Sequence, residues 1–305
     1  MLTLFTSEAV DRFVDLGRLR AAIRDAHLAH GRGEIAAPGR LDAGAPGREY
    51  HVKAGEALGF YAVKANSGFF DNPPDRPAIQ GAILVFDSRF GTPVAVIHSG
   101  RLTALRTAAA SCVAMQALRS EVHRVAILGS GTQARAHRRA VLDTFPEAEV
   151  GVIPRTDWSQ RSSSAGIDAR ACVATSDVVI TVTPARQPLL ELDDVRNDAL
   201  VVAVGADAPG KQELATDLMS AAAVVADVAV QALAVGESQH LADQYAGLRG
   251  SVVELGAILA GRSPVIAPNE LTVYDSTGTG FQDAAAAAAL VTNATNVPSE
   301  VVLEW

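Results

Sequence analysis

Apolar residues recur at helical spacing near the start of the chain and then give way to short runs typical of strands. Leu19, Ile23 and Ala26 share one face of a helix predicted over residues 16–31. Residues 40–47 are rich in Gly, Ala and Pro, which predicts a loop. The next runs follow one another without a helical segment between them, so they predict an antiparallel sheet. These runs are Glu49–Lys53, Gly59–Val63, Ala82–Asp87 and Pro93–His98.

The pattern changes after a helix predicted over Leu102–Leu118. Val125–Leu128 is a continuous apolar run, as expected for a strand buried on both faces of a sheet. Strand-like and helical runs alternate from there on, which predicts parallel βαβ units. A missing or shortened helix is expected between Arg155 and Asp177, because that stretch is polar and rich in serine. The later strands are expected at Glu149–Ile153, Val178–Thr183, Leu200–Val204 and Ala222–Asp227.

Together these patterns predict an α/β protein of two domains. A Rossmann-type, doubly wound parallel sheet is expected over residues 119–270. It is inserted in a second, α+β domain made of residues 1–118 and 271–305. A C-terminal helix beginning near Phe281 is expected to return to that second domain.

The composition is ordinary for a globular protein, with 49% hydrophobic and 20% charged residues in a chain of 305. The formal net charge of −8 excludes nucleic acid as the main partner. Cys112 and Cys172 are far apart and make neither a disulfide framework nor a metal site, which indicates a reducing compartment. No apolar run reaches the roughly 18–20 residues of a membrane helix, and Met1–Ala9 carries no basic leader pattern. These features predict a cytoplasmic protein that binds neither membrane nor metal.

A glycine-rich turn between the first buried strand and a helix is the sharpest local signal. It reads G-x-G-x-x-A and comprises Gly129, Ser130, Gly131, Thr132, Gln133 and Ala134. The first glycine permits the tight turn, the second lets the backbone approach a pyrophosphate, and the small alanine lets helix and strand pack closely. In this context the motif predicts a dinucleotide cofactor.

The end of the second strand bears on which nicotinamide cofactor is bound. An acidic residue at this place would hold the ribose hydroxyls of NAD, but no carboxylate occurs there before Asp157. Arg155 and Thr156 instead suit a 2′-phosphate, which favours NADP, with NAD as the alternative.

Four motifs in this order resemble the ornithine cyclodeaminase/μ-crystallin family, from about residue 34 to residue 290. They are Thr103–Ala109, the turn at residues 129–134, Val204–Leu214 and Asp275–Gly278. The resemblance implies an inserted Rossmann domain and a substrate domain that is made of both chain ends and dimerises. It therefore also implies a homodimer acting on a small-molecule imino or amino acid.

The resemblance implies roles for individual residues. Lys64 matches the family lysine beside the substrate's α-carboxylate and imine, and Arg106 matches the arginine that holds the carboxylate. Arg40 occupies the place of a second carboxylate-binding arginine, and Asp207 matches the acid that exchanges a proton with the substrate nitrogen. Without the resemblance, Lys64 would be interpreted as a surface lysine and Asp207 as a turn residue. The cofactor is expected beside Thr107, Thr183, Val204, Gly205, Ser276 and Gly278.

The chain departs from the cyclodeaminase pattern shortly before Lys64. Cyclodeaminases carry a glutamate and then Met-Pro there, whereas this chain has His51 near the glutamate position and Lys53 at the methionine position. The surrounding residues look more like the amino-acid dehydrogenase and iminosuccinate reductase branch of the family. Lys53 would suit a substrate with a second carboxylate; alternatively, it lies at a strand end in solvent.

These observations predict an NAD(P)H-dependent reduction of a 2-imino acid, or of a 2-keto acid with ammonia, to an L-amino acid. In this hypothesis Arg106 and Lys64 hold the carboxylate, while Asp207 or Lys64 manages the nitrogen's proton. Ornithine cyclodeaminase and cyclic ketimine reductase are alternative reactions. A cofactor-binding protein without catalysis is the alternative from another class.

Overall fold

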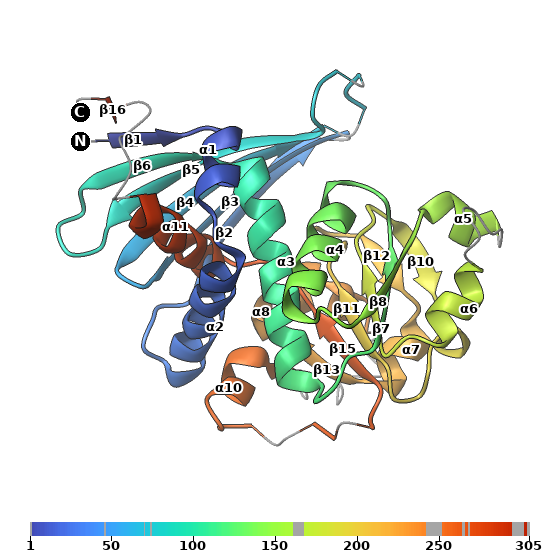
Figure 1. The fold of residues 1–305 in the computed structure, drawn as a ribbon. Helices are drawn as coiled ribbons and strands as arrows, with labels where there is room; N and C mark the ends of the chain where they lie inside the picture. Colours follow the sequence, from blue (N-terminus) through green and yellow to red (C-terminus); the bar gives the residue numbers. More distant parts are fainter. Residues whose placement is uncertain are drawn as a thin grey trace. The chain divides into compact units, whose positions relative to one another are not determined.

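The computed structural model describes residues 2–45, 47–69, 71–73, 75–160, 168–241, 252–263, 266–267, 269–294 and 302–303. The chain divides into two compact units, Met1–Ala110 with Thr279–Trp305, and Ser111–Gly278 (Figure 1). Both chain ends therefore belong to the first unit, as expected for an inserted domain. The divisions fall inside helix α3 (Ser99–Leu118) and just before helix α11 (Gly280–Ala294), rather than at the predicted residues 118 and 271.

The first unit is built on one sheet in the order β16-β1-β6-β5-β4-β3-β2. Neighbouring strands from β2 to β6 are antiparallel, as the sequence predicts, while β1 runs parallel to β6. The strands are β1 (Leu2–Phe5), β2 (Gly39–Ala45), β3 (Arg48–Ala57), β4 (Phe60–Gly68), β5 (Ile79–Asp87), β6 (Pro93–His98) and β16 (Val302–Leu303).

The predicted loop at residues 40–47 is wrong, because most of it is the edge strand β2. Its backbone pairs with β3 from Gly39 opposite Ala54 to Ala45 opposite Arg48. An edge strand needs pairing on one side only, so it tolerates small residues that give no alternating pattern. Its one large apolar side chain, Leu41, is 66% exposed, which explains why the hydrophobic pattern missed the strand.

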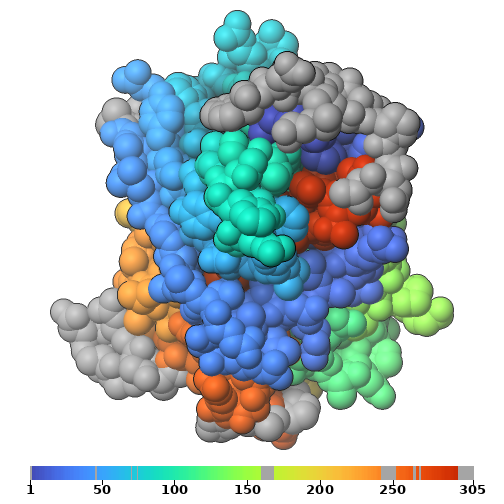
Figure 2. Space-filling model, turned by 90° about the vertical axis from the view of Figure 1, so that its left-hand side faces the viewer, coloured from blue at the N-terminus to red at the C-terminus, as the bar shows by residue number. Residues whose placement is uncertain are grey.

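The helices of the first unit are α1 (Ser7–Phe13), α2 (Leu16–Arg32), α11 and the first part of α3. The predicted helix over residues 16–31 is confirmed as α2, which starts at the N-cap Asp15 and ends at Gly33 with φ +74°. Figure 2 shows α11, in red, against the blue N-terminal helices, and α11 also packs on β3 and β4.

Two glycines let α11 approach the sheet very closely. A Cβ atom on Gly280 would lie 2.0 Å from the Ala54 carbonyl oxygen, and one on Gly55 would lie 2.4 Å from the Phe281 nitrogen. Larger residues at either position would push the helix away from the sheet. The first turn of α11 is therefore held directly against the face of β3 and β4.

The second unit contains an all-parallel sheet in the order β14-β13-β15-β11-β9-β7-β8. It confirms the predicted Rossmann-type fold. Its strands are β7 (Arg124–Leu128), β8 (Glu149–Ile153), β9 (Val178–Thr181), β11 (Leu200–Ala203), β13 (Ala223–Ala226), β14 (Val253–Glu254) and β15 (Thr272–Asp275). A separate pair consists of β10 (Arg186–Leu190) and β12 (Gln212–Leu214). The helices are the rest of α3, α4 (Thr132–Thr144), α5 (Arg155–Gln160), α6 (Ala169–Ala174), α7 (Thr216–Ala221), α8 (Ala229–Val235) and α10 (Leu255–Leu259).

Two details of the second unit differ from or refine the prediction. Strand β15 lies between β11 and β13, so this sheet includes residues 272–275, and the second unit extends to Gly278 rather than to the predicted residue 270. The irregular crossover after β8 contains the six-residue helices α5 and α6, as expected for a shortened helix. Residues 161–167 of its serine-rich stretch lie outside the described residues.

Candidate active site

Three cationic residues lie in register across the first unit's sheet. Arg40 on β2 is opposite Lys53 on β3, and Lys53 is opposite Lys64 on β4. Residues directly opposite one another in a sheet point to the same face, here the face that carries α11. Lys53 is 5% exposed and Lys64 2% exposed, so neither is the solvent-exposed lysine of the alternative interpretation. The prediction ended the strand at Lys53, whereas β3 continues to Ala57 and buries the lysine within it.

A buried carboxylate on α11 joins two of the predicted substrate-binding residues. Lys64 Nζ lies 2.7 Å from Asp283 Oδ2, and Arg106 Nε donates to Asp283 Oδ1 at 2.8 Å. Arg106 also donates from Nη1 to Gln282 Oε1 at 3.1 Å. Asp283 is fully buried and Arg106, on α3, is 3% exposed. The structure thus brings Lys64 and Arg106 together around one carboxylate.

Asp283 and Gln282 were not predicted as site residues, although the sequence carries a signal for them. They stand side by side just ahead of the alanine-rich run of α11, in the most apolar helix of the first unit. Charged residues are almost never fully buried unless they are paired. A polar pair inside such a helix therefore indicates a partner elsewhere in the fold.

The burial of this group changes its acid–base properties. Burial, reinforced by the charges of Arg106 and Lys53, lowers the pKa of Lys64 to about 7, and the opposing effect of Asp283 is smaller. Burial alone would raise the pKa of Asp283, but the charges of Arg106 and Lys64 outweigh it and lower that pKa. Asp283 therefore stays ionised at neutral pH. Lys64 can exchange a proton near pH 7, which suits a general acid or base.

Arg40 is held by a neighbouring carboxylate on its own strand. Its Nε donates to Asp42 Oδ2 at 2.6 Å, and Asp42 Oδ1 lies 2.6 Å from His51 Nδ1. Burial opposes ionisation of Asp42, but the hydrogen bonds from Arg40 and His51 lower its pKa. His51 Nε2 lies 3.3 Å from Glu49 Oε2. The charge of Arg40 is thus balanced within this edge of the sheet.

The glycine-rich turn of the second unit has the geometry that a dinucleotide requires. Gly129 has φ +130°, and a Cβ atom there would lie 2.9 Å from Val182 Cγ2. Gly131 is the N-cap of α4 and makes no side-chain cap, and no atom lies within 4 Å of its Cβ position. Ser130 and Thr132 are exposed, Gln133 is half-buried, and Ala134 is buried between helix and strand. The amide groups at the start of α4 can therefore receive an anion.

Other predicted cofactor residues follow neighbouring strands of the same sheet. Thr183 follows β9, Val204 and Gly205 follow β11, and Ser276 and Gly278 follow β15. The carboxyl ends of parallel strands meet at one edge, which is where nucleotides bind in such folds. The structure therefore brings these residues to the edge that carries the glycine-rich turn.

A buried glutamate that the sequence analysis missed ties two of these loops together. Glu213 accepts hydrogen bonds from Thr181 Oγ1 at 2.7 Å, Thr183 N at 2.6 Å and Gly205 N at 2.8 Å. A Cβ atom on Gly205 would lie 2.4 Å from Glu213 Cδ, so the glycine is required at this contact. Burial raises the pKa of Glu213. Its role is to fix the loops after β9 and β11.

Asp275, at the end of β15, holds a further loop in the same way. It accepts hydrogen bonds from Glu237 N at 3.1 Å, Ser238 N at 2.8 Å and Ser238 Oγ at 2.7 Å. Burial raises its pKa to about 7. These bonds fix the turn that begins at Gly236, at the edge of the sheet where the carboxyl ends of the parallel strands meet.

The remaining predicted residues have different surroundings. Asp207 lies beyond β11 and accepts from Lys211 Nζ at 2.8 Å, with its side chain 40% exposed. Arg155 and Thr156 begin α5 directly after β8, and both are exposed. Thr107 is buried on α3 in the first unit, whereas the other predicted cofactor residues belong to the second. Its cofactor contact stays a prediction.

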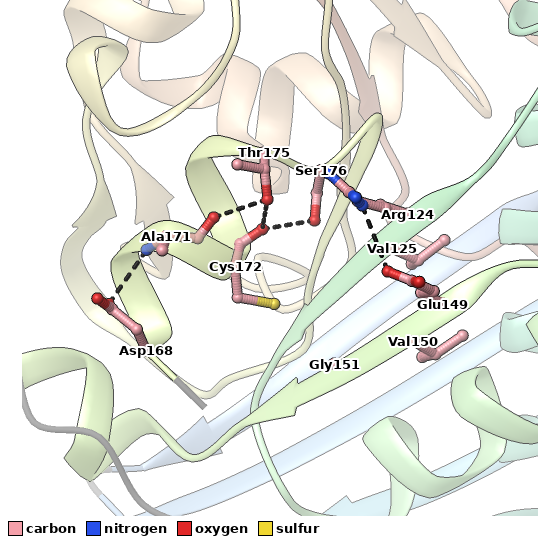
Figure 3. A pocket seen from close by; sticks show the side chains of 10 residues that line it. All are labelled: Arg124, Val125, Glu149, Val150, Gly151, Asp168, Ala171, Cys172, Thr175 and Ser176. Atoms are coloured by element: carbon pink, nitrogen blue, oxygen red, sulfur yellow. Dashed lines mark hydrogen bonds and ion pairs between the residues drawn. The ribbon is translucent and has the colours of Figure 1, made fainter. Parts of the chain in front are cut away.

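Figure 3 shows a pocket of about 430 Å³ that none of these residues lines. It is lined at the amino ends of β7 and β8, where Arg124 and Glu149 form an ion pair, and by Cys172 on α6. The glycine-rich turn is at the opposite end of β7, so this pocket is not the cofactor site.

In the described parts of the chain, no cluster of His, Cys, Asp or Glu side chains could hold a metal. None of the helices described there is both long and apolar enough to span a membrane.

The chain is similar to known proteins in both sequence and structure. Residues 51–297 match the model of the ornithine cyclodeaminase/mu-crystallin family. The chain is 33% identical to the iminosuccinate reductase of Paracoccus denitrificans over 70% of each chain. It is 34% identical to the rat (Rattus norvegicus) ketimine reductase mu-crystallin over 69% of this chain and 68% of the relative. A solved archaeal alanine dehydrogenase dimer with bound NAD superposes with a TM-score of 0.88 at 25% identity over 99% of both chains. The solved P. denitrificans reductase with NAD+ superposes with a TM-score of 0.84 at 26% identity over 97% of both.

Proposed function

Because the chain belongs to the ornithine cyclodeaminase/mu-crystallin family, we propose that it is an NAD(P)H-dependent enzyme that reduces a 2-imino acid to an L-amino acid. The imine can form from a 2-keto acid and ammonia. The observation that carries this proposal is the buried group of Lys64, Arg106 and Asp283. Two cations share one carboxylate there, so the group keeps one positive charge for a substrate carboxylate.

The first task of these residues is to bind and orient the substrate. The Arg106 guanidinium offers a planar fork to the α-carboxylate, and Asp283 fixes its orientation through Nε. Lys64, whose Nζ contacts the same Asp283 carboxylate, contributes a second cation for the α-carboxylate. Fixing the carboxylate also fixes the neighbouring imine carbon, and such positioning supplies much of the rate enhancement in reactions between two bound partners.

The second task is to manage one proton. The bound nicotinamide supplies a hydride to the imine carbon. Lys64 Nζ, whose pKa is about 7, can give the imine nitrogen the proton that completes the amine. Asp207 is the alternative donor, and Lys211 holds its carboxylate at 2.8 Å. The imine is thereby reduced by the two electrons of the hydride and by one proton from the protein.

The cofactor that we propose is NADP, with NAD as the alternative. The turn from Gly129 to Ala134 supports a dinucleotide, since it offers amide groups at a helix start and no side chain at Gly131. Arg155 and Thr156 are exposed at the end of β8, where the adenosine ribose lies in Rossmann folds. A guanidinium and a hydroxyl at this place suit a 2′-phosphate.

Arg155→Ala is expected to change cofactor preference. The ratio of kcat/KM with NADPH to kcat/KM with NADH should fall by roughly 10- to 100-fold, because a charge-assisted contact with the 2′-phosphate is lost. Steady-state kinetics with both cofactors measures this ratio. Arg124→Ala is the matched control, since Arg124 is exposed at the opposite end of the sheet. An unchanged ratio in Arg155→Ala would show that this residue does not select the cofactor.

We also propose a homodimer, since the solved archaeal alanine dehydrogenase is a dimer. The face of the first unit's sheet opposite α11 carries apolar side chains that are only partly buried. Leu41 is 66% exposed, Tyr50 46% and Tyr61 39%, and all three point to that face. Several exposed apolar side chains on one face of a sheet are consistent with an interface. Light scattering tests this proposal, and a mass of one 31.7 kDa chain in solution would contradict it.

The choice between an enzyme and a cofactor-binding protein without catalysis can be tested at Asp207. The unaltered protein should oxidise NADPH only when a 2-keto acid and ammonia are both present. Asp207→Asn should lower that rate by roughly 100-fold if Asp207 rather than Lys64 gives the proton, and NADPH should still bind in either case. Binding without oxidation in both proteins, over a panel that also includes a cyclic imine and L-ornithine, would favour the binding role.

A further inference from the structure

The Arg106 guanidinium is held at two points by neighbouring residues of α11. Its Nε donates to Asp283 Oδ1 at 2.8 Å, and its Nη1 donates to Gln282 Oε1 at 3.1 Å. A bond at Nε alone would let the plane of the guanidinium turn about the N–H axis, whereas the second bond at Nη1 fixes that plane. Each Nη group carries two N–H donors, so the fork between Nη1 and Nη2 still has donors for a carboxylate. Gln282 therefore sets the plane in which Arg106 offers these donors.

The neighbours of Gln282 determine which way its amide group points. Its Oε1 receives the Arg106 Nη1 group and also the Thr279 backbone N–H, at 3.3 Å. Both of these groups are donors only, so the amide oxygen must face them and the amide nitrogen must lie on the other side. That nitrogen lies 2.9 Å from His27 Nε2. An amide nitrogen can only donate, so His27 Nε2 accepts, and the ring is neutral with its proton on Nδ1.

His27 reaches this amide from α2, 255 positions away along the chain. Its side chain is fully buried, and the Phe281 ring packs edge-on against it with 5.1 Å between the ring centroids. Turning the Gln282 amide over would place its oxygen against the His27 acceptor and its nitrogen against the donors of Arg106 and Thr279. Three buried hydrogen bonds would break at once, and unpaired buried polar groups are costly. His27 thereby locks the amide in one orientation.

The Gln282 side chain also caps the start of α11, but capping does not explain the whole arrangement. Gln282 N donates to Thr279 Oγ1 at 3.4 Å, which together with the bond from Thr279 N makes a reciprocal capping box. Glutamate serves in such a box as well as glutamine does. A glutamate at this position, however, would place a second carboxylate against Arg106 and would have no proton for His27. The neutral amide keeps the positive charge of Arg106 for the substrate.

We propose that Gln282 is a positioning residue that sets the plane of the Arg106 guanidinium for the α-carboxylate, and that neutral His27 locks the Gln282 amide. This inference rests on the proposed imine reduction and adds two residues to its carboxylate site. Both residues act through Arg106 and exchange no proton with the substrate. Their loss should therefore weaken binding of the carboxylate more than it slows the chemical step.

Steady-state kinetics with pyruvate and ammonium tests the role of Gln282. Gln282→Met keeps the length of the side chain and removes its polar atoms, so the KM for pyruvate should rise roughly 10- to 100-fold while kcat falls by less than about threefold. Gln282→Glu, which keeps the helix cap, should raise KM at least as much. Asn293→Leu is the matched control on the same helix, because it removes hydrogen bonds with Arg18 and Phe13. It should lower Tm and leave KM within about twofold.

His27→Met and His27→Gln form a matched pair, because the two new side chains have similar length and only one carries a hydrogen-bond acceptor. His27→Met should raise KM roughly 3- to 10-fold, and His27→Gln should leave it within about twofold. Because His27 acts through Gln282, the double variant His27→Met with Gln282→Met should have the same KM as Gln282→Met alone. Additive effects on KM would show that His27 only packs α2 against α11.

Nitrogen-15 NMR of the arginine side chains provides a measurement that needs no substrate. A guanidinium held at Nη1 gives separate Nη1 and Nη2 signals, because rotation about its Nε–Cζ bond is slow, whereas a loosely held one gives a single averaged signal. Arg106, assigned by the loss of its signals in Arg106→Lys, should give separate signals in the unaltered protein and in Asn293→Leu, and an averaged signal in Gln282→Met.

Separate Arg106 signals in Gln282→Met, or an unchanged KM in that variant, would overturn the inference while imine reduction stands. If no keto acid is reduced by the unaltered protein, the proposed function fails. The NMR comparison then still decides whether Gln282 holds Arg106, since it depends on neither substrate nor turnover.

Discussion

Lys64→Met is expected to lower kcat/KM for imine reduction by roughly 1000-fold or more. The substitution removes both a cation that binds the α-carboxylate and the group that gives the imine nitrogen its proton, and general acids alone contribute about 10²–10⁴-fold. NADPH binding should be unchanged, because the glycine-rich turn belongs to the second unit. Lys64→Arg is the matched control, because it keeps the charge but does not titrate near neutral pH. It should bind substrate nearly as well as the unaltered protein and still lose most of the turnover.

The pKa of Lys64 also decides whether kcat/KM rises or falls with pH. The reductive reaction needs the protonated lysine, and the pKa of Lys64 is about 7. Since kcat/KM reports the free enzyme, its value for reduction should fall as the pH rises above about 7. The oxidative reaction needs the neutral lysine, and its kcat/KM should rise with pH up to that value. A reductive profile that keeps this inflection in Lys64→Arg would show that another group, with Asp207 as the first candidate, supplies the proton.

Asp283→Asn is expected to lower the free energy of unfolding by about 3–5 kcal/mol, because it leaves buried cations without their counter-charge. Asp283 is fully buried and lies within 2.8 Å of both Lys64 Nζ and Arg106 Nε. Urea unfolding measures the loss. Asp25→Asn on the exposed side of α2 is the matched control and should change stability by less than about 0.5 kcal/mol.

A double-mutant cycle separates lost pairing from lost packing. Asp283→Asn combined with Lys64→Met removes one charge of each sign, so it should be more stable than Asp283→Asn alone. Strictly additive losses would contradict the account of a mutually compensated buried group. They would mean that Asp283 stabilises α11 without acting through Lys64.

Local patterns in the sequence were sufficient to predict most of the fold. The long apolar runs of the second unit predict its parallel strands, because such strands are buried on both faces. Two errors have clear physical causes. Strand β2 consists largely of small or exposed residues and is held by backbone pairing with β3, which leaves no side-chain pattern. Strand β15 lies far along the chain from β11, so its place in the sheet depends on long-range pairing.

The site was predictable only where a motif is contiguous. The turn from Gly129 to Ala134 lies within six residues, so its geometry follows from local sequence. Asp283 and Lys64 are 219 positions apart and meet only because Gly55 and Gly280 let α11 lie against β3. The burial of Lys53 depends on the full length of β3 and on its register with β4. Neither the register between β3 and β4 nor the close contact of α11 with β3 can be predicted from a short stretch of residues.

In the proposed reaction, hydride from the nicotinamide reaches an imine carbon whose carboxylate is held by Arg106 and Lys64. The most direct measurement uses NADPH deuterated at C4 with a 2-keto acid and ammonium, followed by mass spectrometry and NMR of the product. The expected product is an L-amino acid with one deuterium at Cα, formed together with an equal amount of NADP+. Proline formed from L-ornithine with no net change in cofactor, and no labelled amino acid from any keto acid, would contradict it and indicate a cyclodeaminase.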